Sequence, residues 1–298
     1  MLECSIGIMA YNEERNISKI LHSLINQKEE KIKIAEIVVV SSACTDRTDD
    51  IVKEFAKKDK RIKLVCQETR GGKVKAINDY LKLVKYPIVV MESADTIPSK
   101  NTIENICLPF IENERIGVVG GHPLPANNKN TFMGFVSHMQ WELHHRASTM
   151  KPKCGEILAI RNLMRKIPTD LIIDDAYIEL FFEKKGYKVA YAPSAVVKNK
   201  GPETIKDFIK RRRNLATGFF QLKEKYNYIP STQKTFWLIG ETLKITGFNI
   251  KKIFWSFCVM ILNWWATMLG GYDYYVKKKY NAAWEIATST KELKKDEI

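Results

Sequence analysis

The sequence of 298 residues lacks any close pairing of cysteines. Its six cysteines lie far apart, and no two of them form a C-x-x-C pair. This spacing argues against a zinc site and against a disulfide framework. The first residues also lack a basic segment followed by a long apolar run, so we expect no signal peptide. These absences together predict a reducing, cytoplasmic location.

Acidic residues are scarce relative to basic ones. The chain carries 48 Lys and Arg against 34 Asp and Glu, which gives a formal net charge of +14. Such an excess favours an anionic partner, namely a nucleotide, a phospholipid surface or nucleic acid, although a solvated lysine-rich surface gives the same total. The sequence has no nucleic-acid recognition module and no platform of interleaved aromatic residues, so we expect no nucleic-acid partner.

Apolar runs and segments of helical periodicity alternate along the first two hundred residues. This alternation predicts an α/β fold with a mostly parallel central sheet flanked by helices. We expect strands over residues 4–10, 35–40, 62–66, 88–91, 116–120, 155–160 and 188–192. We expect helices near residues 17–25, 46–55, 74–84, 132–148, 174–182 and 203–224. The length allows one large domain plus an appendage, or two modest domains.

The stretch from residue 88 to residue 96 anchors the functional interpretation. It reads I-V-V-M-E-S-A-D-T, a short apolar run typical of a buried strand followed by a polar break. In open parallel α/β sheets, ligands gather just beyond the carboxyl ends of the strands. Asp95 at that place can hold a divalent cation or a sugar hydroxyl. The alternative is that Asp95 only caps the helix that follows.

Three further groups of residues suit phosphate binding or proton transfer. The segment R-G-G-K at residues 70–73 combines a flexible backbone with two cations, although a double glycine is often just a turn. Asp174 and Asp175 open a helix, where they either stabilise the helix dipole or supply a general base. The basic run at residues 210–213 is either a solvated face or a diphosphate contact, for which arginine is better suited than lysine.

Candidates for a second ligand come from residues 132–160. His144 and His145 are adjacent on a predicted helix and therefore face different directions, which makes them a poor metal pair. We expect a structural or substrate-contact role for them instead. The strand predicted over residues 155–160 brings Glu156 and Arg161 toward a site.

Residues 253–272 form a stretch of twenty residues without a charged side chain, directly after Lys251 and Lys252. This length suffices to span a bilayer. Asn263 lies near its middle, however, and its three tryptophans prefer the membrane interface, so an in-plane or re-entrant helix is an alternative. A buried helix of a soluble protein is the third interpretation.

The order of these motifs resembles that of the family 2 glycosyltransferases, which are inverting enzymes of the GT-A (nucleotide-diphospho-sugar transferase) fold. The resemblance runs from residue 5 to residue 218, and the sequence is most similar to the membrane-associated, polysaccharide-synthase-like branch. Residues 8–13 match the opening strand and loop, and V-S-S-A-C-T-D-R-T at 40–48 matches a nucleotide-binding loop that commonly reads V-D-D-G-S-T-D-G-T. Residues 72–78 match G-K-x-x-A-x-N, residues 93–95 occupy the place of D-x-D, residues 173–175 that of the E-D motif, and residues 210–214 that of Q-x-x-R-W. Trp284 and residues 289–291 resemble a tail segment found after the membrane helices of some relatives.

The resemblance implies a role for each matching residue. It implies a GT-A domain at residues 1–218 and a helical C-terminal region at 219–298, in which 253–272 is membrane-associated. Asp175 would be the catalytic base with Asp174 beside it, and Asp95 would coordinate the metal. The donor-binding residues would be Ala10, Tyr11, Asn12, Glu14, Ser41, Ser42, Lys73, Ser93, Ala94, Asp95, Arg212 and Arg213. The acceptor-binding residues would be Glu156, His145 and Asn214.

Three departures from the family pattern modify these expectations. Ser41 and Ser42 replace two aspartates, so donor recognition would rest more on Asn12, Glu14 and backbone groups. Ser93 replaces the first aspartate of D-x-D, which leaves Asp95 as the metal ligand. Asn214 replaces the tryptophan that stacks on an acceptor sugar in chain-elongating enzymes, so we expect a single transfer rather than processive synthesis.

The function implied is inverting transfer of a sugar from a nucleotide-diphosphate donor, a UDP-sugar, to a hydroxyl of a glycan, lipid-linked or other acceptor. Mg²⁺ or Mn²⁺ would assist, and Lys73, Arg212 and Arg213 would stabilise the leaving diphosphate. The expected location is the cytoplasmic face of the cell membrane, with peripheral attachment or one C-terminal membrane segment.

Two rival functions fit some of the same residues. A catalytically silent nucleotide-sugar-binding or scaffold protein on this fold would explain the serines at positions 41, 42 and 93. Retention of both Asp95 and Asp175 argues against it, because a binding module needs no base. A different nucleotide-dependent transferase with an α/β sheet is the other rival, and the order of the motifs argues against it.

Overall fold

The computed structural model describes residues 1–228, 235–278, 288–290 and 293. The described residues form one eight-stranded sheet with the order β3-β2-β1-β4-β7-β6-β8-β5. Its strands are β1 (Leu2–Ala10), β2 (Ile32–Ser42), β3 (Ile62–Gln67), β4 (Ile88–Ser93), β5 (Thr96–Pro98), β6 (Ile116–Pro125), β7 (Ile157–Arg161) and β8 (Lys188–Asn199). The strands β3, β2, β1 and β4 pair in parallel, as do β6 and β8. The strand β7 is antiparallel to both of its neighbours, and β5 is antiparallel to β8.

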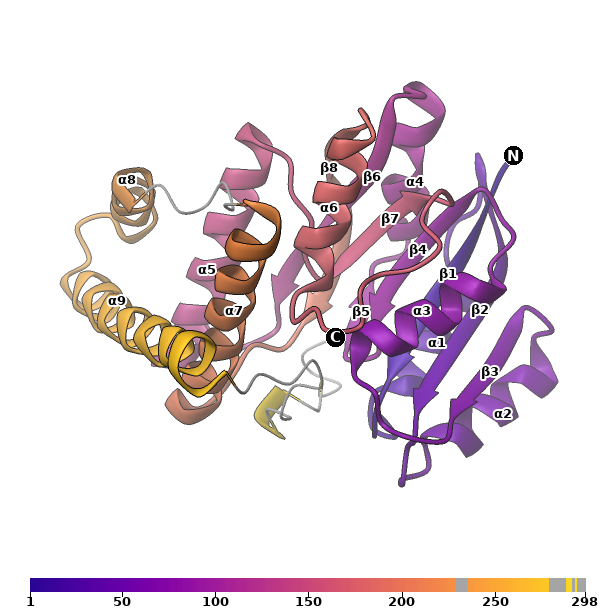
Figure 1. The fold of residues 1–298 in the computed structure, drawn as a ribbon, viewed down its shortest axis with the longest axis horizontal. Helices are drawn as coiled ribbons and strands as arrows, with labels where there is room; N and C mark the ends of the chain where they lie inside the picture. The colour runs from indigo at the N-terminus through magenta and orange to yellow at the C-terminus, as the bar shows by residue number, and fades with distance from the viewer. Residues whose placement is uncertain (229–234, 279–287, 291–292, 294–298) are drawn as a thin grey trace.

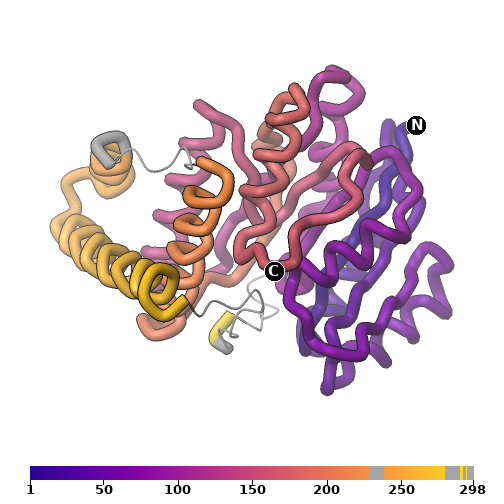
Figure 2. Tube along the Cα trace, in the orientation of Figure 1, coloured from indigo at the N-terminus to yellow at the C-terminus, as the bar shows by residue number. Residues whose placement is uncertain are grey.

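Helices cover both faces of this sheet and extend beyond it (Figure 1). They are α1 (Ile17–Ile25), α2 (Thr48–Lys58), α3 (Lys73–Leu83), α4 (Thr102–Glu112), α5 (Phe132–Met150), α6 (Asp174–Lys184), α7 (Ile205–Tyr226), α8 (Thr235–Thr246) and α9 (Ile250–Gly271). The chain continues from α9 into a π-helical turn, Tyr272–Lys277, and a short 3-10 turn lies at Thr288–Thr290. Figures 1 and 2 show α8 and α9 at the end of the molecule opposite β3, on the far side of α5 and α7.

The alternation of side chains along the strands builds two separate cores. On β1, Cys4, Ile6 and Ile8 face one side of the sheet and pack with apolar residues of α1 and α4. On the other side, Met9 packs with residues of α3 and α6. Because the central strands are buried on both faces, they read in the sequence as nearly continuous apolar runs.

The predicted α/β architecture with helices on both faces is confirmed, and the structure corrects several details of it. The second half of the sheet is mixed rather than parallel, because β7 enters it antiparallel. The patterns also missed the three-residue strand β5 and the helices α4 and α8. Arg161 lies at the far end of β7 from Glu156, where its guanidinium donates to the backbone oxygens of Phe110 and Ile116, so the expectation that it faces the site is wrong.

The strand register brings several polar segments to one edge of the sheet. Ala10 at the end of β1 lies beside Ser41 of β2, and Ser42 lies beside Gln67 at the end of β3. Glu92 near the end of β4 lies beside Ile157 at the beginning of β7. Residues that follow β1, β2, β3 and β4 therefore share this edge with residues that precede β7. We call it the carboxyl edge.

The helix α9 packs against α5 and α7. Its buried residues are Ser256, Val259, Ala266 and Gly270. A Cβ atom on Gly270 would lie 2.7 Å from the backbone oxygen of Arg213, which shows how closely the two helices approach. The predicted division after Gly218 falls inside α7, which continues to Tyr226. Trp284 and Lys291 lie outside the described residues.

The opposite face of α9 is large, apolar and exposed. More than half of each of the side chains of Phe254, Phe257 and Trp264 is open to solvent. Among the described residues, one helix, from Ile250 to Lys277, is long and apolar enough to cross a membrane, and only 22% of its most apolar window is buried. A soluble helix normally buries its large apolar residues. The third interpretation of residues 253–272, a buried soluble helix, is therefore wrong.

A prediction follows from the contact between β1 and α3. Gly7 faces the ring of Tyr80, and a Cβ atom at position 7 would lie 2.3 Å from that ring. Tyr80 cannot move away freely because it is buried and its hydroxyl donates to Ser5 Oγ at 2.8 Å. We expect Gly7→Ala to lower the free energy of unfolding by about 1–3 kcal/mol, measured by denaturant titration. The control is Gly240→Ala on α8, where no atom lies within 4 Å of the added Cβ and stability should not fall. An unchanged stability of Gly7→Ala would contradict this packing.

Candidate active site at the carboxyl edge

Hydrogen bonds join the loop that follows β1 to the loop that follows β2. The backbone of Asn12 has a positive φ of 52°, and its side-chain Oδ1 accepts from Thr45 N at 2.9 Å. Glu14 N donates to Asp46 Oδ2 at 3.1 Å, and Glu14 Oε2 accepts from Arg47 N at 3.2 Å. Asn12 and Glu14, both predicted donor-binding residues, thus hold the second loop in place. These hydrogen bonds within the protein fix the shape of this part of the carboxyl edge.

Buried hydroxyl groups without partners lie beside these loops. Among the described residues, Ser41 Oγ and Ser42 Oγ are buried and have no hydrogen-bond partner. Gln67 Oε1, on the neighbouring strand, is in the same state. Buried polar atoms normally find partners, so a group of unsatisfied ones indicates a place for a polar ligand. Ala10 is buried next to Ser41.

Two cations follow β3. The guanidinium of Arg70 lies over the ring of Tyr11, with 4.1 Å between Cζ and the ring centroid. Gly72, with a φ of 81°, turns the chain into α3, which starts at Lys73. The Nζ atom of Lys73 then reaches Asp174 Oδ2 at 3.0 Å. The beginning of α3 is thereby joined to the beginning of α6.

Asp175 is the carboxyl group best suited to accept a proton. Burial and the neighbouring charge of Asp174 raise its pKa to about 6, against the opposing charges of Lys73 and Lys153. Its Oδ1 accepts from Ala176 N at 2.8 Å, which fixes the carboxyl group at the start of α6. A base with a pKa near the working pH is mostly ionised and still takes up a proton readily. Burial opposes the charge of Lys73, but Asp174, Asp175 and Glu156 outweigh it and raise the pKa of Lys73.

A second ion pair joins β7 to α7. Arg211 Nη2 donates to Glu156 Oε1, which also accepts from Asn199 Nδ2 at 3.4 Å. Burial alone would raise the pKa of Glu156, but Arg211 and Lys73 bring it below its usual value. Arg211 itself also senses the charge of Asp95. Glu156, Arg211, Lys73 and Asp95 therefore belong to one electrostatic cluster.

The next two arginines on α7 have different environments. Burial and the charge of Arg211 lower the pKa of Arg212 to about 10, and in the described part of the chain its guanidinium has no hydrogen bond or ion pair. Arg213 instead forms a two-point ion pair with Asp273 in the π-helical turn that follows α9, with Nη2 and Oδ1 2.5 Å apart. The prediction that Arg213 binds the donor lacks support in these contacts, because its guanidinium is committed to Asp273. Arg211 takes its place in the cluster.

The predicted metal ligand lies in the turn between β4 and β5. Ser93 ends β4, Ala94 is buried, and Asp95 is partly exposed. The helix-cap alternative for Asp95 is wrong, because β5 follows directly and α4 begins at Thr102 with Asn101 as its N-cap. Burial, together with Asp95, raises the pKa of the neighbouring Glu92 to about 8. The raised pKa favours the protonated form of Glu92.

The remaining predicted acceptor contacts lie on α5 and α7. His145 Nδ1 lies 2.8 Å from the hydroxyl of Tyr191, and its ring stacks on that of His122 at 4.3 Å between centroids. His144 points elsewhere, with Nε2 2.9 Å from the backbone oxygen of Cys154, as expected for adjacent helical positions. Asn214 is partly exposed on α7, three residues beyond Arg211. These contacts leave open a role of His145 or Asn214 toward an acceptor.

The sequence did not show that two particular residues, Arg211 and Lys153, would belong to the cluster. Arg211 lies within a basic run, but which of four consecutive basic residues faces the edge depends on the packing of α7. Lys153 precedes β7 by a few residues and is one of many lysines. Burial lowers its pKa, and its charge interacts with those of Asp175 and Arg212. Both became visible only once the helices were placed.

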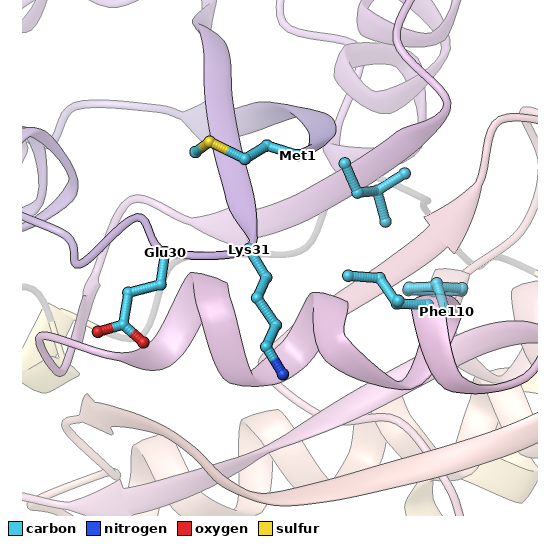
Figure 3. Close-up of a pocket in the computed structure, with 6 residues that line it drawn as sticks. Met1, Glu30, Lys31 and Phe110 are labelled. Atoms are coloured by element: carbon cyan, nitrogen blue, oxygen red, sulfur yellow. The ribbon is translucent and has the colours of Figure 1, made fainter.

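A hollow elsewhere on the surface has a different character. It has a volume of about 640 Å³ and is lined by Met1, Leu2, Glu30, Lys31, Phe110 and Ile111 (Figure 3). Met1 and Leu2 lie at the amino end of β1, which is the edge of the sheet opposite to Asp95. It is open and mostly apolar, and it contains none of the residues of the electrostatic cluster. The hollow is therefore not the candidate active site.

Two sequence profiles of known families each match more than half of the chain. The sequence profile described as glycosyl transferase family 2 matches residues 5–169, and that of glycosyl transferase family group 2 matches residues 88–276. The chain belongs to glycosyl transferase family 2. The resemblance inferred from the motifs is thus confirmed.

Curated relatives of this family 2 glycosyltransferase are similar over most of the chain. The poly-β-1,6-N-acetyl-D-glucosamine synthase of Staphylococcus epidermidis is 25% identical over 276 residues, which cover 87% of this chain and 66% of that protein. The synthase of Staphylococcus aureus strain COL is 25% identical over 223 residues, which cover 71% of this chain and 53% of that protein. The chain spans between about half and two thirds of the length of these relatives.

Solved structures share the fold. A mannosyltransferase from Pyrobaculum calidifontis in complex with GDP-Man and Mn²⁺ superposes with a TM-score of 0.59 at 20% identity, over 90% of this chain and 84% of that one. Glucosyl-3-phosphoglycerate synthase from Mycobacterium tuberculosis, in complex with Mn²⁺, UDP and glucosyl-3-phosphoglycerate, superposes with a TM-score of 0.54 at 18% identity, over 77% and 82% of the chains. The predicted GT-A fold is confirmed by these likenesses.

The described side chains around Asp95 offer few ligands for a divalent cation. In the part of the chain that the structure describes, no three His, Cys, Asp or Glu side chains gather as a metal site. Glu92, the neighbouring carboxyl group, is buried, and its raised pKa favours the protonated form. Asp95, which is partly exposed in the turn, is thus the candidate metal ligand. Mg²⁺ is commonly held by one or two carboxylates plus substrate phosphates, so this single carboxylate fits a cation that arrives with the donor.

The ion pair between β7 and α7 yields a prediction about stability. Arg211→Met would leave the mostly buried carboxylate of Glu156 without its guanidinium. We expect a loss of about 1–3 kcal/mol in the free energy of unfolding, measured by denaturant titration. Arg211→Met combined with Glu156→Met should recover part of that loss, because no unpaired charge remains.

The control for this cycle is Lys53→Met. Lys53 pairs with Asp50 at 3.4 Å, and both side chains are more than half exposed. Removing an exposed pair should change stability by less than about 1 kcal/mol. If the loss of unfolding free energy in the double variant equals or exceeds the sum of the losses in the two single variants, Arg211 and Glu156 do not act as a pair.

Proposed function

We propose that the protein transfers one sugar from a UDP-sugar to a hydroxyl group of an acceptor, with inversion at the anomeric carbon. One observation carries this proposal. A carboxyl group with a pKa near 6, Asp175, lies in the same electrostatic cluster as Arg212, a guanidinium without a protein counter-ion in the described chain. The first suits a general base, and the second suits a phosphate.

The nucleotide end of the donor fits the part of the carboxyl edge where β1, β2 and β3 end. The unsatisfied hydroxyls of Ser41 and Ser42 would bind the nucleoside, together with backbone groups near Ala10 and Tyr11. The Staphylococcus synthases act, by their names, on N-acetyl-D-glucosamine polymers. A UDP-linked sugar is our choice of donor because such sugars commonly serve this class of transfer.

The diphosphate would lie between the two halves of the edge. Asp95 would hold Mg²⁺ or Mn²⁺ against it, with Ser93 and Ala94 shaping the turn, and the ion would supply charge stabilisation to the leaving group. Lys73 and Arg212 would contact the phosphate oxygens directly, and Arg211 would complete the positive field. Arg213 would act indirectly, by holding α7 to α9 through Asp273.

The reaction is a single displacement at the anomeric carbon. The acceptor oxygen forms a bond to that carbon while the bond from the carbon to the diphosphate oxygen breaks, and the electron pair leaves with the nucleoside diphosphate. The hydroxyl proton goes to the carboxylate of Asp175. Asp174 pairs with Lys73, and its negative charge raises the pKa of Asp175 against the opposing charges of Lys73 and Lys153.

The acceptor would approach from the part of the carboxyl edge next to β7. The predicted contacts for its hydroxyls are Glu156 just before β7, Asn214 on α7 and His145 on α5. Asn214 stands where chain-elongating relatives have a stacking tryptophan, so we propose single transfer rather than polymer synthesis. The acceptor is a glycan or a lipid-linked molecule.

We also propose that the protein works on a membrane surface, with α9 lying in the plane of the interface. The apolar face of α9 is bracketed by Lys251, Lys252 and Lys277, which suit anionic headgroups. The helix contacts α7 from Phe208 to Phe220, and a crossing α9 would draw the basic residues of α7 into hydrocarbon. We propose that the C-terminal region that follows α7 lies at the cytoplasmic face of the membrane.

The first prediction concerns the base. Asp175→Asn keeps the size of the side chain but cannot accept the proton, so kcat for transfer should fall at least ~100-fold. The dissociation constant of the UDP-sugar, measured by calorimetry, should change by less than about threefold. Asp170→Asn is the matched control on an exposed carboxyl group and should leave kcat unchanged. Near-normal turnover of Asp175→Asn would exclude Asp175 as the base.

The second prediction concerns the metal ligand. Asp95→Ala should remove the increase in UDP affinity that Mn²⁺ produces, a loss of about tenfold or more in the dissociation constant, which corresponds to ~1.4 kcal/mol. Calorimetric titrations of UDP with Mn²⁺ and with a chelator measure it. Without metal, the variant and the parent should bind UDP alike. An intact Mn²⁺ effect in Asp95→Ala would place the cation elsewhere.

The third prediction concerns the membrane. Replacing Phe254, Phe257 and Trp264 together with glutamine should reduce binding to anionic vesicles at least ~tenfold in a flotation assay, since each buried apolar side chain contributes about 1.5–3 kcal/mol. Leu83→Gln, at an exposed apolar residue on α3, is the control and should bind as the parent does. Unchanged flotation of the triple variant would show that α9 does not mediate attachment.

A further inference from the structure

Gln67, the last residue of β3, carries a hydrogen-bond acceptor that no described residue satisfies. The residue is only 8% exposed, and its Oε1 atom is buried without a partner among the described residues. The other end of the amide is engaged, because Nε2 donates to Asp79 Oδ2 on α3 at 2.7 Å. The protein thus holds one end of this amide and leaves the other end for a ligand.

Asp79 decides which end of the amide is left over. Burial alone would raise the pKa of Asp79, but hydrogen bonds from Lys82 and Gln67 bring it below its usual value. Lys82 Nζ lies 2.7 Å from Asp79 Oδ1. The carboxyl group is therefore ionised at neutral pH, and a carboxylate can only accept hydrogen bonds. The amide nitrogen of Gln67 must face it, so the remaining atom is an oxygen, which accepts and cannot donate.

Ser42 offers a complementary group next to this oxygen. It is the last residue of β2, and it is the partner of Gln67 in the register of the two parallel strands. Val40 and Val65, two residues earlier on each strand, pack with apolar residues of α3, so Ser42 and Gln67 point to this same face. Ser42 Oγ is buried and, within the described ranges, has no hydrogen-bond partner. Its hydroxyl group can donate.

The pair lies where the proposed function places the nucleoside. Both residues end their strands at the carboxyl edge, and the chain continues from Gln67 to Lys73, a proposed contact of the diphosphate at the start of α3. Neighbouring strands lie about 4.8 Å apart, so one small planar group can reach both side chains. A nucleobase is such a group, and its edge carries donors and acceptors in a fixed order.

We propose that Gln67 and Ser42 select a nucleobase in which a ring N–H lies next to a carbonyl group. The proposal rests on the proposed function, because it assumes a nucleotide-linked donor. The ring N–H donates to Gln67 Oε1, and the hydroxyl of Ser42 donates to the carbonyl oxygen. Uracil has this pair of groups. In cytosine the ring nitrogen carries no hydrogen, so its lone pair would face that of Gln67. Asp79 is a positioning residue that keeps the amide from turning.

UDP and CDP test this preference without a change in the size of the base. Calorimetric titrations of the full chain with each nucleotide are made in the presence of Mn²⁺. We expect the dissociation constant of CDP to be at least ~tenfold higher, because Oε1 would stay buried without a donor. Equal affinities, or tighter binding of CDP, overturn the proposal. Binding of neither nucleotide refutes the nucleotide-dependent function itself.

A first variant connects the preference to Gln67. Gln67→Met keeps a long side chain and removes the amide oxygen, so the dissociation constant of UDP should rise at least ~fivefold. That of CDP should change less, which brings the two nucleotides within about threefold of each other. Equal weakening of UDP and CDP would assign Gln67 to the ribose or to the fold alone, and this result overturns the proposal.

A second variant tests the role of Asp79. In Asp79→Asn the new side chain can donate as well as accept, so the amide of Gln67 can turn and present its nitrogen to the base. The ratio of the CDP and UDP dissociation constants should fall at least ~threefold. A merely structural role of Asp79 would weaken both nucleotides alike, and an unchanged ratio overturns its positioning role. Asp50→Asn, at an exposed carboxyl group on α2, is the control and should keep the ratio of the parent.

Discussion

The ion pair between Lys73 and Asp174 is the contact on which the candidate active site depends. It joins the beginning of α3, which belongs to the parallel half of the sheet, to the beginning of α6. Without Lys73, the adjacent carboxylates of Asp174 and Asp175 would repel each other in a largely buried place, and both would tend to protonate. With it, the pKa of Asp175 lies near 6. One cation thus lets two acidic residues coexist where a base is needed.

A second constraint is the attachment of the arginine helix to the apolar helix. Three consecutive residues of α7 have three different environments: Arg211 pairs with Glu156, Arg212 has no partner in the described chain, and Arg213 pairs with Asp273. The orientation of α7 is therefore set from both sides. If α9 lies in the membrane surface, the same contacts would orient the site toward that surface.

The amount that the sequence could predict differs between the fold and the site. Apolar runs such as residues 88–91 predicted the central strands, because strands buried on both faces leave a continuous apolar signal. The direction of β7 and the existence of α4, which contains Pro109, left no such signal. At the site, spacing singled out Asp95 and Asp175 as candidates, but it could not show that Arg211 rather than Arg213 pairs with Glu156. That choice depends on how α7 packs, and Lys153 emerged only from its neighbours in space.

The central claim is that Asp175 is the base of an inverting transfer, and the pH dependence of kcat/KM tests it most directly. This quantity reports the ionisation of the free protein. Burial and Asp174 raise the pKa of Asp175, so the base is protonated and inactive at low pH and becomes active as the pH rises through about 6. We predict a rising limb with an apparent pKa near 6 and a plateau above it. A kcat/KM that is unchanged between about pH 5 and pH 7.5 would contradict the assignment.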